Sequence, residues 1–136
     1  MRVVLDTNIF VSALLSRGGP PDLIRLAWEA KRFTLISSRW QLAELRRISR
    51  YPRLRPLLKP HEVGRLVLRI ERYAEILTDL PTLDLSPDPD DNPLLAMAVA
   101  GQADLLVTGD KAHVLVLGKV AETPIVSARD FVARLR

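Results

Sequence analysis

Four acidic residues stand at positions where a carboxylate could do chemistry. Asp6 follows an apolar run that predicts a buried strand, and Asp110 follows a second such run after one glycine. Functional groups in a parallel sheet gather beyond the carboxyl ends of its strands, so these two aspartates are expected near each other. Either one alone could be a turn or cap residue, but two of them after predicted buried strands favour a site.

Glu44 lies on a largely apolar face of a predicted helix. At roughly 100° per residue, its neighbours on that face are Trp40, Ile48 and Tyr51. A carboxylate in such surroundings requires a cationic partner, a proton or a metal ion. The alternative to a functional role is an ion pair with Arg47, three residues further along the helix.

Asp91 stands at the start of the most apolar helical segment, in register with Leu94 and Leu95. The position also suits a helix cap, together with its neighbours Asp90 and Asn92. Asp90 could take the functional role in place of Asp91, but the helical register favours Asp91.

Together, the four carboxylates predict a metal site built from oxygen ligands. The chain contains no cysteine and only two histidines, which excludes disulfides, thiol nucleophiles and cysteine zinc sites. Oxygen ligands suit a hard cation such as Mg²⁺ or Mn²⁺, and crowded carboxylates need such a cation to offset their repulsion. The metal can activate a water for attack on a phosphodiester. The predicted metal ligands and catalytic residues are Asp6, Glu44, Asp91 and Asp110.

The positive charge of the chain is concentrated in one segment. The net charge is +4 over 136 residues, while residues 39–59 carry seven basic side chains against one acid. This distribution favours a polyanionic partner such as nucleic acid. Arg46 and Arg47 are candidates for gripping RNA, with a solvated helix face as the alternative. Lys111, beside Asp110, could meet a phosphate or pair with a carboxylate.

Strand-like and helix-like segments alternate along the chain, which suits one domain over residues 1–136. Strands separated by helices predict an α/β fold with a mainly parallel sheet covered on both faces. No apolar run approaches the roughly 18 residues of a membrane span, so a soluble, cytoplasmic protein is expected. The predicted strands are Arg2–Leu5, Phe33–Ser37, Ile76–Leu80, Leu105–Thr108 and Ile125–Ser127, and the predicted helices are Asp22–Lys31, a helix from Ser38 to about Arg50, His61–Leu77, Leu94–Ala100 and Ala128–Leu135.

Several of these segments together resemble a PIN domain, and the resemblance extends over essentially the whole chain. It is closest to the bacterial and archaeal branch described as toxins of toxin–antitoxin pairs. The residues that carry it are Val4–Asn8, the helix of Glu44, Asp91–Ala98, Leu106–Lys111 and Thr123–Phe131.

The resemblance implies a three-layer α/β/α sandwich with a five-stranded parallel sheet. It implies hydrolysis of RNA by a metal-activated water, with one or two Mg²⁺ or Mn²⁺ ions, a homodimer, and silencing by an antitoxin that inserts into the site. Asn8 and Thr108 would orient carboxylates or the attacking water. Residues 111–114 lack a further acid that many relatives carry, which argues against a complete second metal site. The family's acidic positions would be filled by Asp6, Glu44, Asp91 and Asp110.

Two other functions compete with a metal-dependent ribonuclease. The first is a PIN-like module that binds RNA or protein without turnover, and the intact set of four acids argues against it. The second is an aspartyl-phosphate phosphatase. Its nucleophile motif needs an aspartate two residues after the first, where this chain has Asn8.

Overall fold

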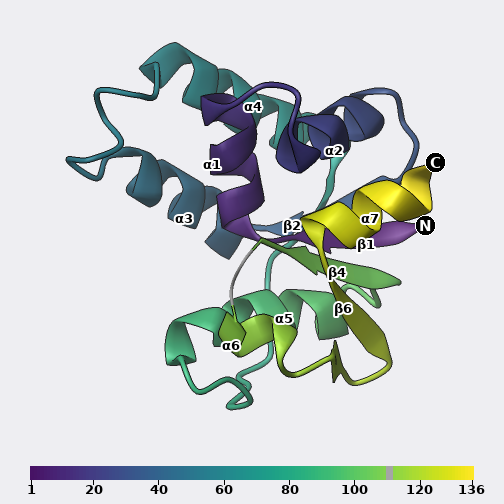
Figure 1. Cartoon of the computed structure of the whole chain (residues 1–136). Coiled ribbons are helices and arrows are strands. Elements are labelled where there is room, and N and C mark those ends of the chain that lie inside the picture. Colours follow the sequence, from purple (N-terminus) through teal and green to yellow (C-terminus); the bar gives the residue numbers. More distant parts are fainter. Residues whose placement is uncertain (110–111) are drawn as a thin grey trace.

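Six strands form one sheet in the computed structural model, which describes residues 1–109 and 112–136. Their order across the sheet is β3-β2-β1-β4-β6-β5 (Figure 1). All neighbours run parallel except β5 and β6, which are antiparallel. The strands are β1 (Arg2–Leu5), β2 (Thr34–Ser38), β3 (Glu75–Leu77), β4 (Leu105–Thr108), β5 (Lys119–Val120) and β6 (Thr123–Ser127).

Helices cover both faces of the sheet, so the predicted three-layer α/β/α architecture is confirmed. Figure 1 shows α1, α2, α3, α4 and α7 on one side and α5 and α6 on the other. The helices are α1 (Thr7–Leu15), α2 (Pro20–Glu29), α3 (Arg39–Ser49), α4 (Pro60–Tyr73), α5 (Asn92–Ala100), α6 (Ala112–Leu115) and α7 (Ala128–Leu135), and the short 3₁₀ helix η1 spans Pro89–Asp91.

Each face of the sheet carries its own apolar core, because successive strand residues point to opposite faces. Val3 and Leu5 of β1 pack into the core beneath α1, α2, α3, α4 and α7. Val4, between them, packs into the core formed with α5 and α6. Val3, Val4 and Leu5 are each at most 2% exposed. This burial on both faces is what fixes the ends of β1 and its parallel neighbours in space.

The prediction of five strands was wrong by one. Five strands run parallel as expected, and β5 is an additional antiparallel strand at the edge next to β6. Strand β5 has two residues, and its Val120 pairs with Thr123 of β6. A tight turn joins the two strands, and in it Ala121 has a φ of 50°. Two residues are too few to produce an alternating hydrophobic pattern, so the sequence gives no signal for such a strand.

Helices α1 and α6 were not predicted, and α4 is shorter than predicted. Helix α1 was not predicted, because its residues are apolar on nearly every side and show no helical period; five of its nine residues are buried. Helix α4 ends at Tyr73 instead of Leu77, since Ala74 is extended and the chain enters β3, where Ile76 pairs with Ser37. Within the described ranges, no helix is long and apolar enough to cross a membrane.

Candidate functional site

The site lies where the chain changes direction across the sheet. From β1 the chain builds β2 and β3 outward on one side, and then returns to β4 on the other side of β1. Connections that leave two adjacent parallel strands in opposite directions open a crevice at their carboxyl ends, and ligands bind there in open α/β sheets. Asp6 follows β1 and Thr108 ends β4, so both residues stand at this crevice.

The Asp6 carboxylate is held by both strands. Asp6 is 2% exposed, and its backbone N–H donates to the Val107 carbonyl at 2.8 Å. One carboxylate oxygen, Oδ1, accepts from the Asn8 backbone N–H at 3.2 Å and so caps α1. The other, Oδ2, accepts from the Thr108 hydroxyl at 2.8 Å. Asp6 is therefore a helix cap and also a buried carboxylate in a fixed orientation.

Replacing Thr108 by valine should destabilise the protein by about 1–3 kcal/mol. The Thr108 hydroxyl is fully buried, and its loss removes one hydrogen bond to the charged Asp6. Urea unfolding measures the change. Thr34→Val is the control, because Thr34 is exposed in the neighbouring strand β2 and is expected to change stability by less than about 0.5 kcal/mol. Equal stability of the Thr108 variant and the wild type would show that the hydrogen bond does not hold Asp6.

Asp91 reaches the same crevice from the opposite helical layer. Asp91 lies at the junction of η1 and α5 and is 4% exposed, whereas its neighbour Asp90 is exposed. The Ser86 hydroxyl lies 3.5 Å from Oδ2 of Asp91. Asp91 is the N-cap residue of α5, and among the described residues its side chain makes no capping hydrogen bond to that helix. Of the two adjacent aspartates, the structure buries the one that helical register favours.

The loop before Asp91 is held by its neighbour Asn92. The side-chain oxygen of Asn92 accepts from the backbone N–H groups of Leu85 and Ser86 at 3.1 and 3.0 Å. The Asp88 carboxylate accepts from the Asp90 N–H at 3.0 Å and starts η1. These hydrogen bonds fix the backbone on both sides of Asp91. The position of the Asp91 carboxylate is therefore set by the loop that precedes α5.

Glu44 forms the ion pair that was the alternative to a functional role. The Arg47 guanidinium lies 2.6 Å from Oε1 of Glu44, and this hydrogen bond and charge raise the pKa of Arg47 above its ordinary value. The Glu44 side chain is 19% exposed and that of Arg47 is 59% exposed. A pair this open to water contributes little to stability, and Arg47 also donates to the Tyr51 hydroxyl and lies over the Tyr51 ring.

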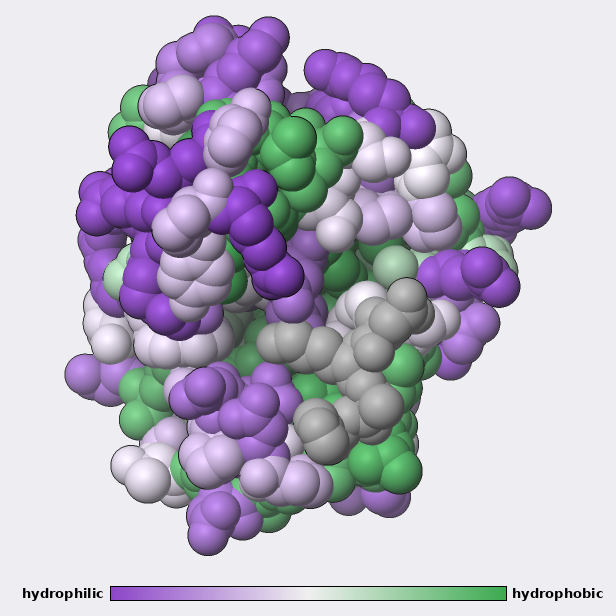
Figure 2. All heavy atoms as spheres, turned by 60° about the vertical axis from the view of Figure 1, so that its left-hand side comes forward, coloured by the Kyte–Doolittle hydropathy of each residue, from purple (hydrophilic) through white to green (hydrophobic). Residues whose placement is uncertain are grey.

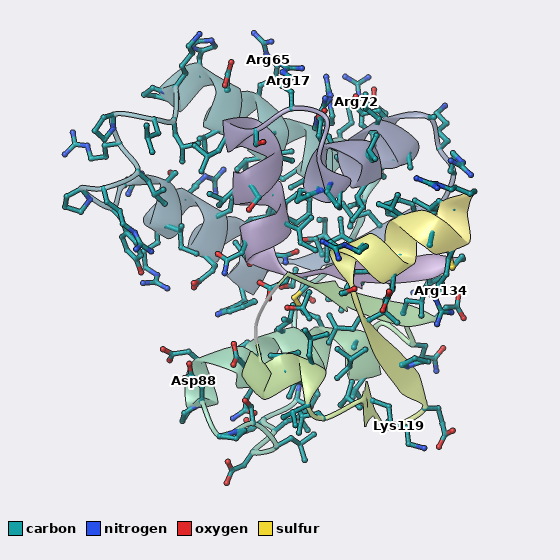
Figure 3. All side chains as sticks on the ribbon, viewed as in Figure 1. Arg17, Arg65, Arg72, Asp88, Lys119 and Arg134 are labelled. Atoms are coloured by element: carbon teal, nitrogen blue, oxygen red, sulfur yellow. The ribbon has the colours of Figure 1, made fainter. Side chains whose placement is uncertain are left out.

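A pocket of about 320 Å³ joins these residues. It opens on the face shown in Figure 2, where hydrophilic residues gather over the α3 side above and over the η1 side below. Figure 3 shows Asp88 at the outer edge of the lower layer. Among the described lining residues, Arg47 is the one cation, and the lining acids are Asp6, Glu44, Asp88, Asp90 and Asp91.

This lining is chemically suited to a divalent cation. Five carboxylates against one guanidinium create a strongly negative pocket, and oxygen atoms are the ligands that Mg²⁺ and Mn²⁺ prefer. Among the described residues, however, no three acidic, histidine or cysteine side chains lie close enough to hold a metal together. The predicted residues Asp110 and Lys111 lie outside the described residues. The roles of Asp6, Glu44 and Asp91 as metal ligands therefore stay predictions.

The remaining predicted residues divide between two places. Asn8 lines the acidic pocket, beside Asp6. Arg46 does not: it pairs with Glu71 of α4 at 3.3 Å, on another side of α3. The structure thus separates Arg46 from Arg47, although they are adjacent in the sequence.

Gln41 was not predicted from the sequence as a site residue, but its side chain holds the end of β1 next to Asp6 in place. Its side chain is 1% exposed, donates to the Leu5 carbonyl at 2.6 Å and accepts from the Ser37 hydroxyl at 2.7 Å. It therefore connects the end of β1 to β2 and α3. A signal was present, because Ser38 and Gln41 have the spacing of a capping box. Ser38 does accept from the Gln41 N–H, but the glutamine side chain turns to the sheet.

Two of the comparisons with known proteins point to the PIN domain. The family model for the PIN domain matches residues 2–112. The uncharacterized protein MJ1680 of Methanocaldococcus jannaschii is 28% identical over 113 residues, which cover 82% of this chain and 72% of that protein. The solved structure of the PIN domain of human SMG5 aligns over 100% of both chains with a TM-score of 0.57 and 16% identity. At that identity, the structural likeness shows the fold alone.

Proposed function

Because the chain belongs to the PIN-domain family, whose members are generally nucleases, we propose that it is a metal-dependent ribonuclease that hydrolyses RNA phosphodiester bonds. One observation carries the proposal. Two buried carboxylates, Asp6 after β1 and Asp91 before α5, reach one acidic pocket at the crevice of the sheet. Two carboxylates buried at one pocket repel each other, and a bound divalent cation would offset that repulsion.

In this proposal Asp6, Glu44, Asp91 and Asp110 hold Mg²⁺ or Mn²⁺. The cation, when bound, supplies Lewis-acid chemistry at the phosphate. Thr108 and the Asn8 backbone keep the Asp6 carboxylate in one orientation through their hydrogen bonds to its two oxygens.

Cations near the acidic pocket have a separate role in the proposal. Arg47 neutralises Glu44 in the free protein and can turn to a phosphate when the substrate arrives, because more than half of its side chain is exposed. Lys111 would meet the substrate next to Asp110. Both residues would bind the phosphodiester beside the carboxylates.

The partners in this proposal follow the branch of the family that the sequence resembles. We propose that the protein is the toxin of a toxin–antitoxin pair, that it acts on RNA in the cytoplasm as a homodimer, and that a cognate antitoxin silences it. The support is the sequence resemblance described above, and the acidic pocket is the place where an antitoxin would bind.

Cleavage of a mixed set of labelled RNAs in Mg²⁺, Mn²⁺ or EDTA tests the activity. Wild type should cut in either metal and not in EDTA, and Asp110→Asn should lose the cutting, because it removes one of the four proposed carboxylates. Equal cutting by both proteins would indicate a contaminating nuclease and contradict the proposal. RNA binding without cleavage by either protein would instead identify a binding module.

A further inference from the structure

A second pocket lies on the far side of α3 from the carboxylates. Its volume is about 640 Å³, and it is enclosed by the end of α3, the following loop and the start of α4. It shares no lining residue with the acidic pocket. The lining residues are Arg46, Ser49, Arg50, Arg55, Leu58, Pro60, Val63 and Gly64.

This basic pocket has the charge of an anion site. Three guanidiniums line it, and of the residues that the structure describes no carboxylate does. Arg46 shares its charge with Glu71, but Arg50 and Arg55 form no ion pair with any described residue. Pro60 opens the 14-residue helix α4 at the pocket, so the positive end of the helix dipole adds to the same charge.

The two pockets lie on opposite sides of one helix. At roughly 100° per residue, Arg46 is about 200° and Arg50 about 240° around α3 from Glu44. A helix with its side chains is about 10–12 Å wide, so an RNA strand that contacts both pockets has to pass around α3.

We infer that the basic pocket holds a backbone phosphate of single-stranded RNA, on the far side of α3 from the bond that is cut at the carboxylates. The inference rests on the proposed function. Guanidinium groups bind phosphate oxygens in a bidentate manner, and among the described lining residues there is no aromatic side chain on which a base could stack. The pocket therefore recognises the RNA backbone and not its sequence.

The test measures RNA binding in EDTA, where no cleavage interferes. The probe is a labelled single-stranded RNA of about 12 nucleotides of mixed sequence, followed by fluorescence anisotropy. Arg50→Ala/Arg55→Ala should raise the Kd about tenfold at low salt and reduce the slope of log K against log salt by about 0.7, since one phosphate contact is lost. The charge-matched control is Lys119→Ala/Arg134→Ala, whose residues lie at the opposite edge of the molecule (Figure 3). Its Kd should change less than twofold.

Gly64 provides a second pair of variants that keeps every arginine. A Cβ at Gly64 meets no atom within 4 Å, so alanine and glutamate both fit on the helix surface. Gly64→Glu should weaken RNA binding several-fold by placing a carboxylate in the basic pocket, whereas Gly64→Ala should bind as the wild type does. Circular dichroism verifies that each variant is folded.

The outcomes separate this inference from the proposed function. Weaker binding by the arginine and glutamate variants supports the basic pocket even if the wild type cleaves no RNA. Unchanged binding and an unchanged salt slope in both variants overturn the inference even if the wild type cleaves RNA. Competition by a poly-glutamate peptide at the same concentration as the RNA would also overturn it, because the pocket would then be a site for acidic protein.

Discussion

Asp6→Asn should reduce metal-dependent RNA cleavage by about 100-fold or more while the protein stays folded. Loss of a residue that merely orients a metal ligand costs about 10–100-fold, so loss of a charged ligand is expected to cost at least as much. Asparagine caps a helix as well as aspartate does, and its oxygen can still accept from the Asn8 N–H. The stability should therefore change by about 1 kcal/mol or less. Cleavage rates in Mn²⁺ and urea unfolding measure the two effects.

Asp6→Ala is the matched comparison for the structural role of the same residue. Alanine provides neither the cap of α1 nor an acceptor for the buried Thr108 hydroxyl, so stability should fall by about 2–4 kcal/mol in total. A folded Asp6→Asn protein with undiminished cleavage would remove Asp6 from the mechanism. Its capping of α1 would then be its whole contribution.

Asp91→Asn should also reduce cleavage by about 100-fold or more, whereas Asp90→Asn should change it less than about threefold. The two aspartates are adjacent and carry the same charge, but Asp91 is 4% exposed and Asp90 is exposed. A buried carboxylate acts at a fixed position, while an exposed one is hydrated and screened by salt. Cleavage of one RNA by the two variants, at equal protein and Mn²⁺ concentrations, makes the comparison.

This pair of variants decides between the two aspartates with the net charge of the protein held equal. Loss of cleavage in Asp90→Asn with full activity in Asp91→Asn would reverse the assignment. Equal and small effects of both would indicate that this loop serves only to close the acidic pocket. The buried carboxylate would then need another explanation, such as its contact with Ser86.

The parts of the site that could be predicted are those set by a single element. Asp6 follows a buried strand, and Thr108 ends the predicted strand Leu105–Thr108. Parallel pairing of these two strands places both residues at the same end of the sheet. The register of Asp91 with the apolar residues of its helix likewise predicts its burial over that of Asp90. In each of these cases a local pattern contains the information.

Features that depend on packing between elements could not be predicted. Helix α1 is apolar almost all round because it is covered from several sides, and this removes the period by which a helix is identified. Strand β5 exists only because β6 offers it an edge. Arg46 and Arg47 occupy different pockets because α4 packs on one side of α3, which their spacing in the sequence does not reveal.

For Glu44 the sequence allowed two outcomes, and the structure combines them. Its spacing from Arg47 permits an ion pair, and its apolar neighbours permit an inward carboxylate. In the structure Glu44 lines the acidic pocket and pairs with Arg47 at the same time. Helix α3 therefore presents a carboxylate and an exposed cation to the acidic pocket, and the basic pocket begins a little over half a turn around the same helix. Under our proposals, both faces of this helix contact the same RNA.

Isothermal titration of Mn²⁺ into the protein tests the central claim most directly, because it asks whether the acidic pocket holds a metal without requiring the right RNA. Wild type and Asp90→Asn should bind Mn²⁺ with similar affinity, and Asp6→Asn should bind at least about tenfold more weakly. Equal Mn²⁺ binding by the wild type and a folded Asp6→Asn protein would contradict the account, since the metal would then lie away from the buried carboxylate at the end of β1.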